Sequence, residues 1–175
     1  MVLNNDNKNL SSQEWEERVV SLRRAAKVIP GGKRLRFNAI VVVGNKNGMI
    51  GLGYGKANEV VDAIRKAKDK AIKNAKPVKL KKNTIPYEVI GKYKGSVILL
   101  KPASKGTGVI AGGAVRPVLE LVGIKDVLTK SLRSNNPVNL VKATINSLYE
   151  LEDINDICAK RGKNIYDIFE KKKND

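Results

Sequence analysis

The chain has 175 residues, and its 34 lysines and arginines against 17 aspartates and glutamates give a net charge of +17. It contains no histidine and only one cysteine, Cys158, which excludes an imidazole general base, a Ser-His-Asp triad, an intrachain disulfide and a cysteine-rich zinc site. A positive charge of this size predicts a polyanionic partner, most often nucleic acid.

The N-terminal half predicts three strands and one helix. In chain order these are residues 14–29, 34–44 and 49–55 as strands and 57–76 as a helix. The first element is ambiguous, because Trp15, Val19 and Leu22 have helical spacing while its paired apolar residues equally suit a strand. The second element is continuously apolar over residues 40–43, as in a strand buried on both faces.

Turn signals separate these elements. Pro30-Gly31-Gly32 predicts one turn, and Asn47-Gly48 predicts a tight hairpin. The helix places acidic residues early and lysines late, which complements the helix dipole, and Pro77 ends it.

The C-terminal half predicts the order strand, strand, helix, strand, helix. The elements are strands over 84–90 and 96–101 joined through 91–95, a helix over 114–122, a strand over 126–133 and a helix over 137–151. A glycine-rich loop covers residues 102–113. Short helical turns are expected over residues 154–158 and 165–169.

These elements indicate an α+β protein of two small domains, βββα followed by ββαβα. The expected division is a disordered leader over 1–15, a first domain over 16–76, a basic linker over 77–83, a second domain over 84–152 and a short helical tail over 153–175. No apolar run approaches the roughly 20 residues that span a bilayer, and the start has no secretory pattern. We therefore expect a soluble, cytoplasmic protein.

Two glycine-rich segments invite a nucleotide-binding interpretation that their spacing does not support. The first, residues 51–56, has Lys56 where a dinucleotide fingerprint needs glycine, and Ile50 and Ala57 where a Walker loop needs glycine and a hydroxyl residue. It predicts either a close approach of backbone to phosphate or only a twisted, bulged strand. The second, residues 104–113, has no neighbouring carboxylate in the sequence to hold a metal, which favours a packing surface on RNA or protein.

Positive charge is concentrated in the first half. Residues 23–82 hold 17 basic and 3 acidic residues, as a binding face does, although a lysine-rich proteome would produce a similar bias. Cations bracket the turn at residues 30–32 and form a basic hairpin tip that suits an RNA groove. Aromatic residues make up 5% of the chain, so Phe37 and Tyr54 alone are a poor stacking platform and recognition of backbone and shape is expected.

Three long blocks, residues 32–57, 100–113 and 134–144, resemble the bacterial small-subunit ribosomal protein five family. The match runs in order from about residue 16 to residue 151. The resemblance implies a double-stranded-RNA-binding-like N-terminal domain, in which residues 18–29 form a strand, and a C-terminal α/β domain of a type shared with RNA-handling and phosphotransfer proteins. The basic cluster that opens the last helix of a true double-stranded-RNA-binding domain is replaced here by Ala57-Asn58-Glu59, which argues against groove-spanning duplex binding.

The resemblance also implies a place and partners. It implies a structural constituent of the small ribosomal subunit, not an enzyme, that lies near the mRNA entry channel and supports decoding fidelity and assembly. The implied partners are small-subunit rRNA, neighbouring proteins four and eight, and mRNA, with no membrane, cofactor, metal or small-molecule substrate.

The residues expected to bind RNA are Arg23, Arg24, Lys27, Gly31, Gly32, Lys33, Arg34, Arg36, Lys46, Gly53, Tyr54, Gly55, Lys56, Lys101 and Lys105. The residues expected at a protein interface, with protein four, are Gly106, Thr107, Gly108, Gly112, Gly113 and Arg116.

Two other classes of protein stay open at this point. One is a small phosphotransferase using the loop over residues 106–113, which would need a carboxylate or lysine poised beside that loop. The other is a free-standing regulator of duplex RNA.

Overall fold

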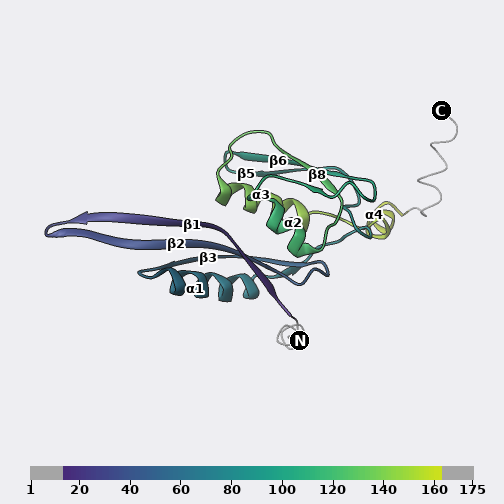
Figure 1. The fold of residues 1–175 in the computed structure, drawn as a ribbon. Helices are drawn as coiled ribbons and strands as arrows, with labels where there is room; N and C mark the ends of the chain where they lie inside the picture. The colour runs from purple at the N-terminus through teal and green to yellow at the C-terminus, as the bar shows by residue number, and fades with distance from the viewer. Residues whose placement is uncertain (1–13, 163–175) are drawn as a thin grey trace.

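The computed structural model describes residues 14–162, which form two four-stranded sheets and four helices. The first sheet has the strand order β1-β2-β3-β4 and the second β5-β6-β8-β7. Helices α2 and α3 lie between the two sheets, and α1 covers the other face of the first sheet (Figure 1). The predicted α+β class and the order of its main elements are confirmed.

The first sheet and its helix come from one continuous stretch of chain. The elements are β1 (Glu16–Ile29), β2 (Gly32–Gly44), β3 (Met49–Ala57), α1 (Val60–Lys73) and the two-residue β4 (Lys76–Pro77). The ambiguous first segment is therefore a strand. The helix predicted from residue 57 begins only at Val60, because Ala57 still pairs with Phe37 at the end of β3.

Strands β1 and β2 extend beyond the sheet as a two-stranded ribbon (Figure 1). Strand β3 pairs with β2 only as far as Phe37, so residues 25–36 have no third strand beside them. Pro30 and Gly31 close the ribbon, and the φ of +93° at Gly31 is the conformation that a Pro-Gly turn places on its glycine.

Helix α1 lies unusually close to β3. An added Cβ on any of three alternate glycines of β3 would lie 1.8–2.0 Å from a carbonyl oxygen of the helix. Two residues of a strand span about 6.6 Å along its axis, and four residues of a helix span about 6.0 Å. Glycines two positions apart in β3 therefore face alanines four positions apart in α1. The pairs are Gly51 with Ala71, Gly53 with Ala67 and Gly55 with Ala63. The glycine-rich strand therefore admits α1, and the expectation that it admits a phosphate chain is wrong.

The second sheet holds one short strand, β7, that sequence periodicity does not mark. The elements are β5 (Val89–Tyr93), β6 (Ser96–Pro102), β7 (Val109–Ile110), α2 (Arg116–Val122), β8 (Val127–Ser131), α3 (Pro137–Tyr149) and α4 (Ile154–Arg161). The strand predicted over residues 84–90 begins only at Val89 and continues to Tyr93, so the predicted connection over 91–95 shortens to the turn at Lys94 and Gly95. Strand β7 lies parallel to β8 inside the predicted loop.

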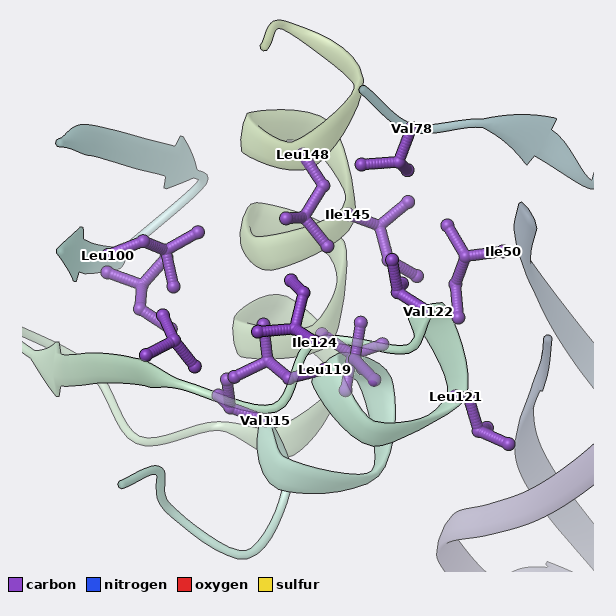
Figure 2. Packing of buried hydrophobic residues seen from close by; sticks show 14 of the residues in the cluster. Ile50, Val78, Leu100, Val115, Leu119, Leu121, Val122, Ile124, Ile145 and Leu148 are labelled. Carbon is purple, nitrogen blue, oxygen red and sulfur yellow. The ribbon is translucent and has the colours of Figure 1, made fainter. Parts of the chain in front are cut away.

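One hydrophobic core joins two units of the fold. The first unit is the first sheet with α1 and the residues that follow β4, and the second unit is the second sheet with α2 and α3. Val42, Ile50 and Val78 come from the first unit and pack in the same cluster as α2, α3 and the second sheet. Figure 2 shows Ile50 and Val78 beside Val122 and Ile145. The backbone amides of Lys46 and Gly48 donate to Leu121 and Val122 carbonyls, each at 2.9 Å. The two units are therefore held together by both packing and main-chain hydrogen bonds.

The segment predicted as a basic linker, residues 77–83, is held by backbone hydrogen bonds near both of its ends. The amide of Val78 donates to the Gly48 carbonyl at 2.7 Å, and Lys81 bridges to Thr84. The boundaries of the two domains stay a proposal. The predicted leader over residues 1–13 and the helical turn over 165–169 lie outside the described residues.

Within residues 14–162, Trp15 packs against the cluster formed by α1 and β2, and Cys158 is buried in α4. No helix in this part of the chain is long and apolar enough to cross a membrane.

Tyr149 ties α3 to the first sheet. Its hydroxyl donates to the Ile50 carbonyl at 2.7 Å and has a backbone hydrogen bond with Lys76, where β3 pairs with β4. Burial raises the pKa of the Tyr149 phenol from its ordinary value of 10.0 to about 12.

A Tyr149→Phe variant is expected to be less sensitive to alkaline pH than the wild type. Since the folded pKa is raised, the folded state holds the phenolic proton more tightly than the unfolded state between pH 10.0 and about 12. The wild type therefore loses the Tyr149 contribution to its unfolding free energy as pH rises through this window. Urea unfolding of both proteins at pH 8, 10 and 11.5 measures the difference, and parallel pH profiles would contradict the expectation.

Candidate nucleic-acid interface

The strand register determines which face of the ribbon each basic residue occupies. Opposite pairs on the ribbon include Lys27 with Arg34 and Arg23 with Asn38, and side chains of opposite residues share a face. Four of the predicted cations lie on one face, namely Arg23, Lys27, Arg34 and Arg36. Arg24 and Lys33 lie on the other face. All six side chains belong to exposed residues.

No ribbon cation makes an ion pair with any residue of the described range 14–162. Like charges placed directly opposite each other on a sheet are destabilising by themselves. The pairing of Lys27 with Arg34 therefore costs the free protein stability, and a polyanion that binds this face would relieve it.

The cationic face continues onto β3. Lys56 pairs with Asn38 in the register, and together with Lys27, Arg34 and Arg36 it lines a depression of about 230 Å³. Tyr54 lies two residues before Lys56 on the same face of the strand and is 46% exposed. This exposed face thus carries the cations of the ribbon and, next to them on β3, the aromatic ring of Tyr54.

The glycines predicted to bind RNA play two different parts. Gly31 and Gly32 lie at the ribbon tip, where an added Cβ would meet nothing within 4 Å, so the tip is open to close approach. Gly53 and Gly55 are buried under α1. They are therefore not RNA contacts, and their prediction as such is wrong.

Two predicted lysines already have carboxylate partners. The Lys46 ammonium lies 2.5 Å from Glu16, and the Lys101 ammonium lies 3.2 Å from Glu88. Such exposed ion pairs contribute little to stability, about 0–1 kcal/mol, so both lysines can exchange partners. Lys105 is exposed in the glycine-rich loop. Their role in RNA binding stays a prediction.

The glycine-rich loop is organised by a carboxylate that the sequence did not reveal as its neighbour. Buried Asp126 accepts from the amides of Gly106 and Gly108 at 2.9 and 3.0 Å. The expectation that no carboxylate lies near this loop is wrong. The signal for it is one acidic residue between Ile124 and Val127, 20 residues after Gly106 and 18 after Gly108. Because Asp126 takes both amides, they cannot cradle a phosphate.

The rest of the loop presents an ordered surface. Gly106 and Gly108 have φ of +94° and +78°, which favour glycine, and nothing lies within 4 Å of an added Cβ at Gly112 or Gly113. The Arg116 guanidinium donates to the Val109 carbonyl at 3.1 Å across the loop. The Thr107 hydroxyl donates a hydrogen bond to the Ser104 carbonyl of the same loop at 2.8 Å. The predicted protein-interface residues therefore belong to one ordered loop and, for Arg116, to the first residue of α2 that follows it.

An Asp126→Ala variant is expected to loosen this loop. Hydrogen bonds to a charged group contribute about 1.5–3 kcal/mol, so the amides of Gly106 and Gly108 should exchange with solvent about 10- to 100-fold faster. Hydrogen-exchange NMR measures both amides directly. Asp126→Asn, which keeps an acceptor oxygen, serves as the matched control, and unchanged exchange in Asp126→Ala would refute the role of Asp126.

The fold and this surface define the class, which is a small two-domain α+β protein with a basic hairpin arm. The family model described as Ribosomal protein S5, N-terminal domain matches residues 15–79, and that of Ribosomal protein S5, C-terminal domain matches residues 91–161. The chain belongs to the ribosomal protein S5 family.

Similar curated proteins agree with the family models. They include the small ribosomal subunit protein uS5 of three Campylobacter jejuni strains, 81-176, 81116 and RM1221. Each is 59% identical to this chain over 140 residues, which cover 80% of this chain and 95% of the relative. The resemblance drawn from three sequence blocks is confirmed.

Proposed function

We propose that this chain is a structural constituent of the small ribosomal subunit that binds small-subunit rRNA. The observation that carries the proposal is the exposed basic ribbon, free of ion pairs in the described residues, on a chain of the ribosomal protein S5 family. The family supports a structural role over the phosphotransferase alternative, and the engaged amides of the glycine-rich loop support the same choice.

The proposed mechanism is charge neutralisation combined with fit of shape. Arginines and lysines of the ribbon contact phosphates and release condensed counterions, while the glycines at the tip let backbone come close to the RNA. Lys56 extends the same face onto the sheet. The glycines of β3 let α1 pack closely on the opposite face of the sheet.

The finer proposal places the protein near the mRNA entry channel, with a part in decoding fidelity and subunit assembly. The ribbon would approach rRNA near the decoding region, and the Asp126-held loop, residues 106–116, would face protein four. Protein eight is the second proposed neighbour, and the proposed location is the cytoplasmic ribosome. Two ordered surfaces on opposite units of a shared core support this division of contacts.

Sedimentation of the full chain with purified small subunits tests the proposal. A structural constituent should co-migrate with them stoichiometrically in high salt. A free-standing regulator of duplex RNA would remain at the top of the gradient, which would refute the proposal.

A further inference from the structure

A second basic surface lies in a groove of about 560 Å³ between the two units. Five elements or their flanks contribute to its walls, namely β3, the end of α1, β4, β5 and α3. Its aromatic and basic lining residues are Tyr54, Tyr93, Tyr149, Lys70, Lys76 and Lys142. Apart from Tyr54, none of these side chains was predicted to bind RNA from the sequence.

The groove is positively charged and its charge is not neutralised. Its lining includes no aspartate or glutamate, and none of its three lysines forms an ion pair with a residue in the range 14–162. The Lys142 ammonium lies 5.0 Å from the centre of the Tyr93 ring and 3.3 Å from its hydroxyl. The Lys76 ammonium lies 5.6 Å from the centre of the Tyr149 ring. Rings orient these ammonium groups and leave them free to meet an anion.

The lining of the groove includes residues of β3 at a free edge of the first sheet. Strand β4 pairs with β3 only at Met49 and Ile50, so within the described residues the outer edge of β3 has no strand partner from Gly51 onward. The Asn74 side-chain amide donates to the Leu52 carbonyl at 3.3 Å, which holds the end of α1 against this edge. The groove is thus built by packed elements.

Tyr54 has the most exposed ring of the three tyrosines that line this groove. It is 46% exposed, while Tyr93 and Tyr149 are half-buried and Tyr149 is fixed by its hydrogen bond to Ile50. Tyr54 also lies two residues before Lys56 on the same face of β3, so the cationic face of the ribbon and the groove adjoin along this strand.

We infer that this groove binds an unpaired segment of RNA, with a base stacked on Tyr54 and phosphates at Lys70, Lys76 and Lys142. Unpaired bases stack on aromatic side chains, and lysines follow the backbone beside them. The inference rests on the proposed rRNA-binding function and names the form of RNA that this surface takes. It also revises the expectation of recognition without stacking, because the fold brings Tyr93 and Tyr149 beside Tyr54.

The test uses the full chain and a labelled single-stranded oligoribonucleotide of about ten nucleotides. Tyr54→Ala should weaken its binding about tenfold or more, because a stacked base is lost, and should leave the salt dependence unchanged. Tyr54→Phe should bind as the wild type does. Affinity of Tyr54→Ala for a duplex of matched length should also equal that of the wild type.

Lys142→Ala should act differently from the tyrosine variant. Loss of one phosphate contact on a single strand should flatten the salt slope of log affinity by about 0.7. Lys130→Ala, an exposed lysine on the far sheet, is the control and should change neither quantity. Unchanged single-strand affinity in Tyr54→Ala, or unchanged slope in Lys142→Ala, overturns the inference.

A crosslink identifies the occupant in the assembled particle. With p-benzoylphenylalanine at position 54, small subunits should give a photo-crosslink to rRNA. A crosslink to a ribosomal protein instead overturns the inference and assigns the groove to a peptide. These outcomes are separate from the sedimentation test, since a protein can co-migrate with small subunits whatever its groove binds.

Discussion

A Gly53→Ala variant is expected to lose about 3 kcal/mol or more of unfolding free energy, a large part of the 5–15 kcal/mol typical of a folded protein. The added Cβ would lie 1.8 Å from the carbonyl oxygen of Ala67 and 2.7 Å from the amide nitrogen of Ala71. Both atoms belong to the backbone of α1, so no side-chain rotation relieves the clash and the helix must shift away from the sheet. Thermal unfolding should show a Tm lowered by about 6–12 °C.

The matched control is the same substitution at Gly113. Nothing lies within 4 Å of an added Cβ there, and its backbone is outside the left-handed region. Gly113→Ala should change the unfolding free energy by no more than about 0.5 kcal/mol. Equal Tm values for the two variants would show that α1 does not rest on β3 as described.

The second large effect is expected on RNA affinity. In a triple variant, Arg23→Ala, Arg24→Ala and Lys27→Ala, each lost phosphate contact removes about 0.7–0.9 from the slope of log affinity against log salt. The slope for small-subunit rRNA should therefore flatten by about two to three units, and affinity at 0.15 M salt should fall on the order of 100-fold. The ribbon carries these side chains in solvent, so the fold should be unaffected.

A second triple variant controls for net charge. Lys92→Ala, Lys130→Ala and Arg133→Ala remove the same three charges from exposed positions of the second unit. This control should flatten the slope by less than one unit, since long-range charge is screened within about 10 Å at 0.1 M salt. Equal slopes in both triple variants would remove the ribbon from the interface.

The main elements were predictable where the signal is local. Alternation before residue 40, the Asn47-Gly48 turn and the alanine stripe of α1 each depend on neighbours within one turn or strand. Strands β4 and β7 were not predictable, because two residues carry no period. The strand predicted from residue 84 began too early because an apolar pattern does not say which backbone groups find a partner, and Val89 is the first to pair with β6.

In the candidate site, too, residues close together in the sequence were predictable and residues from distant segments were not. The ribbon cations were predictable because a charged hairpin tip keeps its residues together in sequence. The glycines of β3 were assigned the wrong partner, because a missing side chain indicates that something comes close and does not say what. Asp126 reaches its loop because β7 pairs with β8 beside it. The lysines of the groove come from α1, β4 and α3, which meet only when the two units pack together.

The contacts between the glycines of β3 and the alanines of α1 repeat at a regular interval. Such a repeat does not by itself determine where along β3 the helix lies. A slip of α1 by one turn would set each glycine against the next alanine, ending with Gly51 at Ala75, and would keep small residues facing each other throughout. The short connections forbid this slip, since only Asn58 and Glu59 join β3 to α1 and two residues join α1 to β4. The length of these loops, and not the close contact itself, fixes the helix in place.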